Sequence, residues 1–379
     1  MSTIGIVIPV YNTEKYIKKC LDSVIHQSYK DFSVCIVDDG STDQSASICD
    51  EYAAADSRIK VIHQNNQGIQ VARLNGLAEL DCDYFTTIDS DDWIELNTLE
   101  KTVPFLNEGI DVVSYGIIRY IDVDRLIYSQ DDFKPGLYVT NDIRSKILPK
   151  MIWNRDEDHF GLDPSICNKV IRKELAYKYL LKANHLKLDY GQDVAVLFPL
   201  MNEVNSLMLL EDYCYFHRQR KIGEIPGYIT DTEFNDKTYG LYKYLLDWFP
   251  DPELKLQIDS YYVFSIEYRM HAIYGVTKKK IFVFPFHNIT DGKKIVLYGA
   301  GDVGKSYFDQ LYNKDVCSVV GWIDSKQRIT YKGYSVAEPE SIMNTKFDYI
   351  VIATINQSIA SEMQAYLEEC GIESNKILF

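Results

Sequence analysis

The sequence predicts an α/β protein in which a large α/β domain and a small one are joined by a helical region. Two observations carry this prediction. Short apolar segments alternate with amphipathic segments over the first 225 residues, as strands and helices alternate in a layered sheet. A second alternation begins near Lys293, with a glycine-rich turn directly after its first apolar segment. The predicted parts are residues 1–225, a connecting region 226–290, and residues 291–379.

Length and charge limit what the chain can be. Its 379 residues suit two or three domains rather than one. With 40 Lys and Arg residues against 55 Asp and Glu residues, the net charge of -15 disfavours a general attraction to nucleic acid or to an anionic membrane. We therefore expect no nucleic-acid partner, and an anionic substrate requires a local basic patch.

The N-terminal segment and the cysteines lead us to expect a cytoplasmic protein. The first apolar segment lacks the length and the basic leader of a signal peptide, and no later apolar run approaches the roughly 20 residues that cross a bilayer. The eight cysteines are far apart and form no CxxC pair, which favours reduced thiols over zinc ligands. A location at the inner face of the cell membrane is left open.

The pattern of the first part predicts strands with helices between them. Apolar segments predict strands at residues 4–10, 32–37, 59–63, 84–88 and 112–118, and helical patterns cover residues 14–26 and 43–55. Ligands of open α/β sheets bind beyond the carboxyl ends of the strands. The turns that follow these strands are therefore the first places to search for a site.

An acidic turn, residues 89–92, follows the fourth predicted strand. Hard oxygen ligands suit Mg²⁺ or Mn²⁺, which neutralises the charge that grows on a departing diphosphate. We expect Asp89 to face a ribose and Asp91 to bind the metal, with Asp92 as a further ligand or a supporting partner. The alternative is that Asp91 and Asp92 cap a helix that starts at Trp93.

A second acidic turn closes the second predicted strand with Asp38 and Asp39. A carboxylate there can accept the imide proton of a uracil, and Gly40 lets the backbone approach a ligand closely. Pro9 and Tyr11, at the end of the first strand, bring a ring to the same edge of the sheet. The alternative is a turn whose side chains cap the next helix, and both interpretations can hold together.

The order and spacing of these motifs resemble family 2 glycosyltransferases. The resemblance covers about residues 3–225 and rests on several segments: Ile8-Pro9-Val10-Tyr11-Asn12, Gln27-Ser28, Val37-Asp38-Asp39-Gly40-Ser41-Thr42-Asp43, Gly68, Ala72-Arg73 and Asp89-Ser90-Asp91-Asp92. It implies a GT-A fold, a Rossmann-like mixed sheet flanked by helices. It also implies an inverting sugar transfer that uses a nucleotide-sugar donor and Mn²⁺ or Mg²⁺.

The resemblance assigns roles to individual residues. It places Pro9, Tyr11, Asp39 and Arg73 around the nucleotide, with Asp38 close by. Asp89 and Asp91 correspond to the Asp-x-Asp pair of the family.

The same resemblance indicates a general base at the start of a later helix, where the family usually has Glu-Asp and this chain has Gln192-Asp193. Asp193 is the candidate base that takes the proton of the acceptor hydroxyl. The alternative is a carboxylate at a helix N-terminus without a catalytic task. Further along, Arg218 and Arg220 are candidates to reach the diphosphate, with a solvated basic turn as the alternative.

A glycine-rich turn dominates the last part of the chain. Gly299, Gly301 and Gly304 follow a predicted strand and open a helix, and Asp324 ends the next strand. This order predicts a small Rossmann-like unit in which the glycines cradle a pyrophosphate and Asp324 binds a ribose hydroxyl. The sequence leaves open whether the unit is a second nucleotide site or a degenerate module that mediates contacts within or between chains, as in a homo-oligomer.

The connecting region carries aromatic residues at helical spacing. Ordinary helix packing explains this spacing, and the alternative is that the aromatic residues line a sugar subsite. Its end, the stretch from Lys278 to Phe284, is basic and then apolar. This stretch reads as a linker, and the alternative is a peripheral contact with a membrane surface.

The favoured function is an inverting glycosyltransferase that moves a sugar, with a UDP-sugar favoured by the resemblance, to a saccharide or lipid-linked acceptor in cell-surface polysaccharide biosynthesis. One alternative is a non-catalytic nucleotide-sugar binding protein in which Gln192 marks lost activity. Another is a sugar nucleotidyltransferase, which the absence of glycine from residues 9–16 disfavours. An NAD-dependent oxidoreductase rests on the last part alone, which is too short for a separate catalytic domain.

Overall fold

The computed structural model describes residues 2–219, 227–274, 282, 284–285, 289, 292–312, 317–326 and 329–379. The chain divides into two compact units, one of Met1–Asn154 with His159–Trp248 and one of Arg155–Asp158 with Phe249–Phe379. Most of the basic stretch from Lys278 to Phe284 lies outside the described residues. The three-part division predicted from the sequence stays a prediction.

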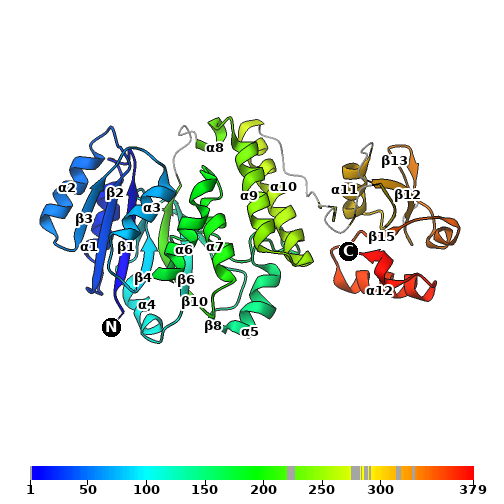
Figure 1. Cartoon of the computed structure of the whole chain (residues 1–379), viewed down its shortest axis with the longest axis horizontal. Helices are drawn as coiled ribbons and strands as arrows, with labels where there is room; N and C mark the ends of the chain where they lie inside the picture. The colour runs from blue at the N-terminus through cyan, green and yellow to red at the C-terminus, as the bar shows by residue number, and fades with distance from the viewer. Residues whose placement is uncertain are drawn as a thin grey trace. The chain divides into compact units, whose positions relative to one another are not determined.

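A mixed sheet forms the centre of the first unit (Figure 1). It has ten strands in the order β3-β2-β1-β4-β9-β6-β10-β5, with β7 beside β6 and β8 beside β10. Strands β1 to β4 run parallel, whereas β9 is antiparallel to both β4 and β6. The strands are β1 Ile4–Val10, β2 Phe32–Asp38, β3 Ile59–His63, β4 Tyr84–Thr87, β5 Trp93–Ile94, β6 Val112–Asp122, β7 Arg125–Ser129, β8 Gly136–Val139, β9 Lys169–Arg172 and β10 Ser206–Arg218.

Helices cover this sheet, and every residue of β1 is buried, as a strand with helices on both faces requires. The predicted α/β fold with a mixed, helix-flanked sheet is confirmed. The helical elements of the first unit are α1 Ile17–Ile25, α2 Ser45–Ala55, α3 Ile69–Ala78, α4 Thr98–Asn107, α5 Thr140–Asp142, η1 Ile143–Ile147, η2 Leu148–Lys150, α6 Lys173–Ala183, η3 Asn184–Leu186, α7 Gln192–Met201, α8 Gly227–Thr230 and α9 Phe234–Trp248.

Alternation along β1 directs its side chains to both layers. Ile4, Ile6 and Ile8 join the core formed with α1, α2 and α4. Val7 points to the other face, where a Cβ atom added to Gly76 of α3 would lie 2.6 Å from its Cγ1 atom. The glycine therefore lets α3 lie close against the sheet, which brings the functional residues of α3 to the strand ends.

One local prediction is wrong. The helix expected to start at Trp93 begins at Thr98 instead, and Trp93–Ile94 form the short strand β5, which pairs antiparallel with β10. The ring of Trp93 stacks on that of Phe216 with a centroid distance of 4.9 Å. This tertiary contact outweighs the local preference for a helix.

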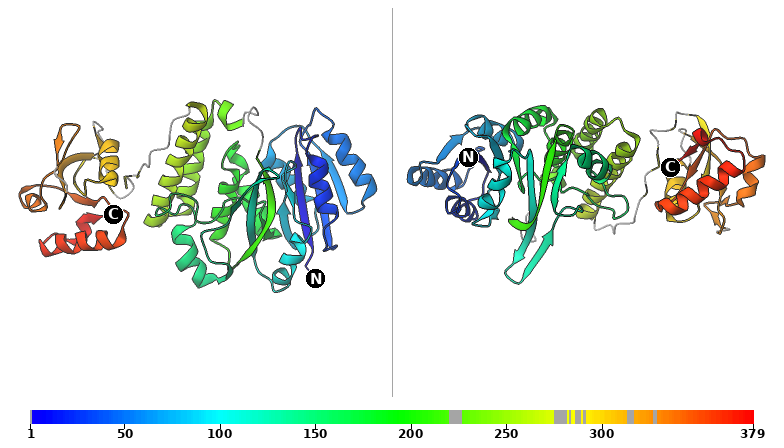
Figure 2. Two further views of the ribbon diagram at one scale, coloured as in Figure 1. Left: turned by 180° about the vertical axis from the view of Figure 1, so that it is seen from behind. Right: turned by 90° about the horizontal axis from the view of Figure 1, so that it is seen from below.

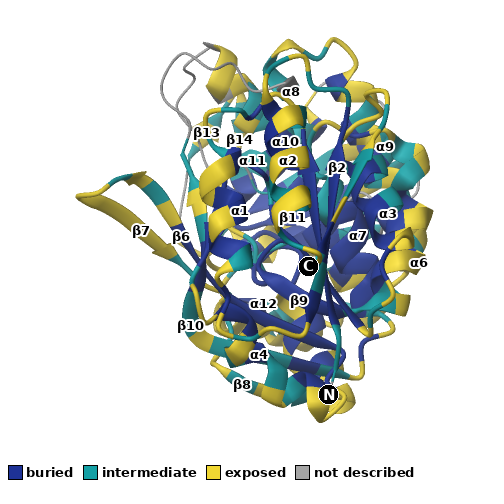
Figure 3. Cartoon of the chain, turned by 90° about the vertical axis from the view of Figure 1, so that its left-hand side faces the viewer, coloured by how far each residue is buried: buried dark blue, intermediate teal, exposed yellow. Residues whose placement is uncertain are grey.

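The hairpin of β6 and β7 extends beyond the body of the sheet, and its end is exposed (Figures 2 and 3). Val123 is 77% exposed, Ile127 53% and Tyr128 55%. The unit thus presents apolar side chains to solvent beyond the end of β6.

The second unit contains α10, Pro252–Tyr274, and a parallel sheet in the order β12-β11-β15-β16. This sheet with its helices confirms the predicted Rossmann-like unit, and α8, α9 and α10 confirm the predicted helical region. Across the described residues, none of the helices has the length and apolar character needed to span a membrane. The remaining elements are β11 Lys293–Tyr298, α11 Asp302–Leu311, β12 Cys317–Ile323, β13 Thr330–Tyr331, β14 Tyr334–Ser335, η5 Pro339–Asn344, β15 Tyr349–Ile352, α12 Gln357–Glu369, η6 Ser374–Lys376 and β16 Ile377–Leu378.

Candidate active site

Asp39 connects the end of β2 to the loop before α3. Its backbone N–H donates to the carbonyl oxygen of Val10 at 2.8 Å, and its side chain is only 3% exposed. The carboxylate accepts hydrogen bonds of 2.8 Å from the side chain of Gln64 and from the backbone N–H groups of Gln67 and Gly68. Asp39 is therefore held rigidly at the carboxyl edge of the sheet, where the sequence predicted it.

The neighbouring Asp38 turns to a different set of partners. Its carboxylate accepts a hydrogen bond from the backbone N–H of Ser41 at 3.1 Å and lies 3.0 Å from Nδ1 of His63. This contact is the main cause of a raised pKa at His63. Asp38 thus fixes the turn after β2 and anchors the end of β3.

The end of β1 lies directly beside this turn, because Val10 pairs with Asp38 in the sheet. Pro9 is buried within the strand, and Tyr11, the first residue past it, is 50% exposed. Asn12 adopts a positive φ of 52° and accepts a hydrogen bond from the backbone N–H of Thr42 at 2.8 Å. The ring of Tyr11 therefore lies at the same edge of the sheet as Asp39.

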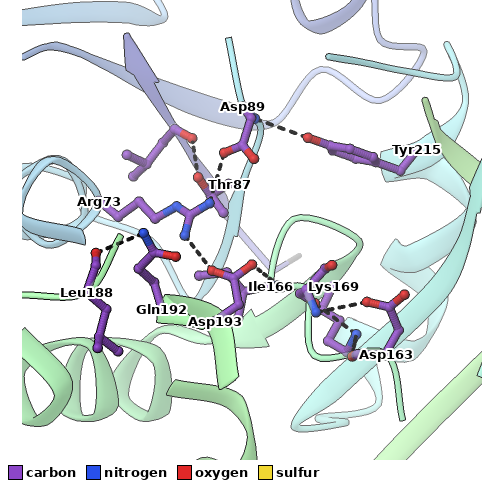
Figure 4. A network of polar contacts seen from close by, with 12 residues as sticks. Arg73, Thr87, Asp89, Asp163, Ile166, Lys169, Leu188, Gln192, Asp193 and Tyr215 are labelled. Atoms are coloured by element: carbon purple, nitrogen blue, oxygen red, sulfur yellow. Dashed lines mark hydrogen bonds and ion pairs between the residues drawn. The ribbon is translucent and has the colours of Figure 1, made fainter. Parts of the chain in front are cut away.

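Arg73 joins two carboxylates that the sequence placed in separate motifs (Figure 4). Its Nη2 atom donates to Asp89 at 2.9 Å and its Nη1 atom to Asp193 at 2.6 Å. The side chain of Arg73 is 3% exposed, whereas those of Asp89 and Asp193 are 30% and 24% exposed. The guanidinium group thus lies below a surface formed by the two carboxylates.

The charge of Arg73 is set by its neighbours. Burial acts to lower the pKa of Arg73, but the negative charges of Asp193 and Asp89 outweigh it, so the pKa is raised. Its Nε atom is buried and has no hydrogen-bond partner among the described residues. The guanidinium stays protonated and holds the ends of β4 and α7 together.

Asp193 stands in the first turn of α7, after Gly191, whose φ is 79°. Its second oxygen accepts a hydrogen bond from the backbone N–H of Ile166 at 3.2 Å. The loop that supplies this donor is held by Lys169, a fully buried residue whose ammonium group donates to the carbonyl oxygens of Asp163 and Ser165 and to the side chain of Asn168. The position of Asp193 thus depends on two elements besides its own helix.

Gln192, where the family usually has Glu, donates from its amide to the carbonyl oxygen of Leu188 at 2.9 Å. This bond closes the turn before α7 (Figure 4). In this structure the glutamine shapes the turn that presents Asp193.

Asp92 is directed into the protein. It is 2% exposed, and its carboxylate accepts hydrogen bonds of 2.7 Å from the hydroxyl of Tyr215 and from the backbone N–H of Arg218. Burial and the nearby charges of Asp91 and Asp89 raise its pKa well above the usual value. The alternative in which Asp91 and Asp92 cap a helix at Trp93 is wrong, because no helix starts there.

Positive charge gathers beside this turn. The Nε atom of Arg218 donates to the carbonyl oxygen of Asp91 at 2.8 Å, and its guanidinium lies 4.8 Å from the ring centroid of Trp93. The ammonium of Lys19 lies 3.2 Å from the centroid of the same ring, and its pKa is lowered by burial and by Arg218. The structure therefore places two cations next to the acidic turn, and Arg220 lies outside the described residues.

Sequence reasoning left two residues of this region unassigned. The pKa of His217 is lowered, first by desolvation and then by Arg119, while Asp89 and Asp91 act in the opposite direction, so its imidazole lies within electrostatic reach of both. Gln70 is 6% exposed, and neither atom of its amide has a hydrogen-bond partner among the described residues. The only sequence signal for Gln70 was its place three residues before Arg73.

Two family models match the chain, one at each end. Residues 5–180 match the model described as glycosyl transferase family 2, and residues 291–378 match the one described as C2185-like, N-terminal. Glycosyltransferase GlyG of Streptococcus pneumoniae is 30% identical over 240 residues, which cover 61% of this chain and 74% of GlyG. The chain belongs to glycosyltransferase family 2.

Other similarities to this family are more limited in extent. Glycosyltransferase GlyA of Streptococcus pneumoniae is 45% identical over 115 residues, so the match spans 30% of this chain and 16% of GlyA. The crystal structure of residues 1–349 of TarS from S. aureus, in complex with UDP-GlcNAc, superimposes with a TM-score of 0.51 at 22% identity and covers 69% of this chain and 73% of that one. This likeness shows that the two proteins share a fold.

Proposed function

We propose that this chain transfers a sugar from a nucleotide-diphosphate donor to a hydroxyl group of a saccharide or lipid-linked acceptor, with inversion at the anomeric carbon. One observation supports this proposal above the others. Arg73 connects Asp89 to Asp193, so the carboxylate assigned to binding of the nucleotide sugar and the candidate base share one surface. A role in cell-surface polysaccharide biosynthesis rests on the family resemblance of the sequence.

The nucleotide base is proposed to bind at Asp39, with Tyr11, Pro9 and Asp38 around it. A carboxylate has about four lone-pair sites, and three of those of Asp39 are used by Gln64, Gln67 and Gly68. The remaining site suits the imide N–H of a uracil. A UDP-sugar is therefore the donor that we favour.

Within the described residues, no three His, Cys, Asp or Glu side chains are arranged to hold a metal ion by themselves. Mg²⁺ and Mn²⁺ do not require such a set, because they bind through one or two carboxylates together with the phosphates of a substrate. Asp89 and Asp91 fit this requirement, and the metal would neutralise charge on the departing diphosphate. Since both oxygens of Asp92 already accept hydrogen bonds within the protein, we assign Asp92 the supporting role.

The cations beside the acidic turn have a proposed role in the same step. Arg218 contacts the backbone of Asp91 and Lys19 lies over the ring of Trp93, beside the turn where we place the diphosphate, and charge-assisted hydrogen bonds to phosphate oxygens are strong. They supply the local positive charge that a chain with a net charge of -15 otherwise lacks. Arg220 stays a predicted diphosphate contact.

Asp193 is proposed as the general base. The acceptor oxygen attacks the anomeric carbon while its proton passes to the carboxylate, and the bond from the anomeric carbon to the diphosphate breaks. No covalent bond to the protein forms, so one attack gives inversion. The two hydrogen bonds that hold Asp193, from Arg73 and from the backbone of Ile166, fix its orientation toward the acceptor.

The experiment is to incubate the chain with Mn²⁺, a panel of nucleotide sugars and saccharide acceptors, and to measure the release of nucleotide diphosphate. We expect release that depends on the acceptor and falls by at least about 100-fold in Asp193→Asn, within the usual range for loss of a general base. If donors bind but no diphosphate is released with any acceptor, the chain is a nucleotide-sugar binding protein instead.

The surroundings of the enzyme follow from this proposal and stay predictions. A nucleotide-sugar donor implies work in the cytoplasm, and a lipid-linked acceptor implies contact with the inner face of the cell membrane. Assembly into homo-oligomers is likewise a prediction.

A further inference from the structure

The C-terminal sheet carries a pocket of about 540 Å³ that the transferase site does not use. Its walls come from the residues that follow β11, β12 and β15, among them Gly301, Asp324 and Thr354, and from Tyr366 of α12. Strands β11 and β15 are neighbours, and the chain leads from β11 to β12 on one side of the pair and from β15 to β16 on the other. This switch point is where open parallel sheets bind ligands.

Two of the three glycines in the turn after β11 are required by the fold itself. Gly299 has a φ of 118°, and a Cβ atom there would lie 2.8 Å from the carbonyl oxygen of Ala353. A Cβ atom on Gly304 would lie 2.0 Å from the carbonyl oxygen of Gly299. A side chain at either position would clash with backbone, so neither glycine says anything about a ligand.

Gly301 differs from both. Its φ of -71° is one that any residue adopts, and among the described residues a Cβ atom there would meet nothing within 4 Å beyond its chain neighbours. It lines the pocket and occupies the N-cap position of α11, where Ser, Asn or Asp would stabilise the helix by a hydrogen bond that glycine cannot make. The fold therefore does not explain this glycine, whereas a ligand that lies against the backbone does.

The groups around Gly301 indicate what that ligand is. The N-cap residue Gly301 makes no side-chain cap to α11, and the first N–H groups of a helix have no partner within the helix, so they suit a phosphate group. Across the pocket, the carboxylate of Asp324 is fixed by the backbone N–H groups of Ala300 and Lys326, each at 2.7 Å. An acidic residue at the end of the second strand of such a unit is placed to accept a ribose hydroxyl.

We propose that the C-terminal unit binds a nucleoside diphosphate at this pocket, as a second site that is separate from the donor site of the transferase. The diphosphate lies against Gly301 and the N-terminus of α11, and the ribose hydroxyls donate to Asp324. Two kinds of ligand carry this group, a dinucleotide such as NAD⁺ and a nucleotide sugar.

Charge around the pocket restricts the ribose. Among the described lining residues, carboxylates outnumber basic groups, with Asp324, Glu338, Glu340 and Glu362 against Lys326. A phosphate on the ribose would face Asp324 and would be repelled by it. The proposed ligand therefore has a ribose without a 2′-phosphate, so NADP⁺ binds more weakly than NAD⁺.

The test is titration of the full chain by isothermal calorimetry with NAD⁺, NADP⁺ and UDP-GlcNAc. EDTA and the substitution Asp39→Ala remove the donor site in every sample. We expect NAD⁺ or UDP-GlcNAc to bind with one site per chain, and the one that binds identifies which kind of ligand the site takes. Gly301→Val should weaken that binding by at least about tenfold, and Gly301→Ala by less.

Gly240→Val is the matched control, because a Cβ atom at Gly240 also meets nothing within 4 Å among the described residues outside its own helix, and Gly240 does not line the pocket. It should bind as the parent does. Valine is less favourable than glycine at an N-cap, so the melting temperature of Gly301→Val should fall by no more than about 8 °C, and the variant should stay folded at the temperature of the titration. The proposal is overturned if neither NAD⁺ nor UDP-GlcNAc binds. It is also overturned if Gly301→Val and Gly301→Ala bind the ligand with the same affinity as the parent.

Discussion

Replacement of Arg73 by leucine tests whether this residue holds the site together. The substitution removes the 2.6 Å contact with Asp193 and the 2.9 Å contact with Asp89, and it leaves two carboxylates beside a buried apolar side chain. Removal of one partner from a fully buried ion pair costs about 3–5 kcal/mol. The carboxylates are 24% and 30% exposed, so water recovers part of this cost.

We therefore expect Arg73→Leu to lower the free energy of unfolding by about 2–3 kcal/mol. For a unit of this size, that corresponds to a decrease of about 4–12 °C in the melting temperature. The assay is thermal denaturation of the full chain followed by circular dichroism, at constant pH and salt.

A combined variant separates this explanation from a simple loss of packing. Adding Asp89→Asn and Asp193→Asn to Arg73→Leu removes the carboxylates that the leucine leaves without a cation, so most of the lost stability should return. A melting temperature for Arg73→Leu equal to that of the parent would show that Arg73 does not stabilise the site. A triple variant as unstable as the single one would show that the cost is not electrostatic.

Two further predictions concern residues near the donor site. The contact with Asp38 raises the pKa of His63, so the stability that this contact contributes is present at pH 6 and decreases as the pH rises through the raised pKa. Relative to His63→Asn, the parent should therefore lose unfolding free energy between pH 6 and pH 8.5, as measured by urea denaturation. The loss should be no more than about 1 kcal/mol, because His63 is 47% exposed and water screens the contact. Gln70→Leu should raise the melting temperature, since it removes a buried amide that has no partner among the described residues and costs about 1–3 kcal/mol. A raised KM for the donor in the same variant would assign Gln70 to donor binding. A lowered melting temperature would show that the amide does not destabilise the fold.

The sequence predicted the parts of the site that depend on local pattern. Asp39 and Asp89 follow strands whose apolar character is plain, and because β2 and β4 lie parallel on either side of β1, their carboxyl ends had to meet at one edge. The same reasoning placed Tyr11 there, since it follows β1. These positions depend only on strand length and on the handedness of parallel connections.

The hydrogen-bond partners of the site residues could not be predicted in the same way. Arg73 was assigned to the nucleotide, but its contacts with Asp89 and Asp193 depend on how α3 and α7 approach the sheet. The sequence left open whether Asp92 is a further metal ligand or a supporting partner, and the pairing of β5 with β10 places Tyr215 where it holds Asp92 inside the protein.

For the glycines of the C-terminal turn, too, the sequence alone does not show why each one is present. All three fit one motif, yet only the surroundings of each Cβ position show that the fold requires Gly299 and Gly304 and leaves room at Gly301. A motif records which residues occur together, whereas the reason for each depends on atoms that are distant in the sequence.

In the proposed transferase site, Asp91 binds the metal and Asp193 acts as the base. The most direct measurement is calorimetric titration of UDP, with and without Mn²⁺, into the parent, Asp91→Ala and Asp193→Asn. We expect Asp91→Ala to weaken the Mn²⁺-dependent binding by at least about tenfold, and Asp193→Asn to bind UDP as the parent does. Equal, Mn²⁺-dependent binding of UDP by Asp91→Ala and the parent would contradict the proposed role of Asp91.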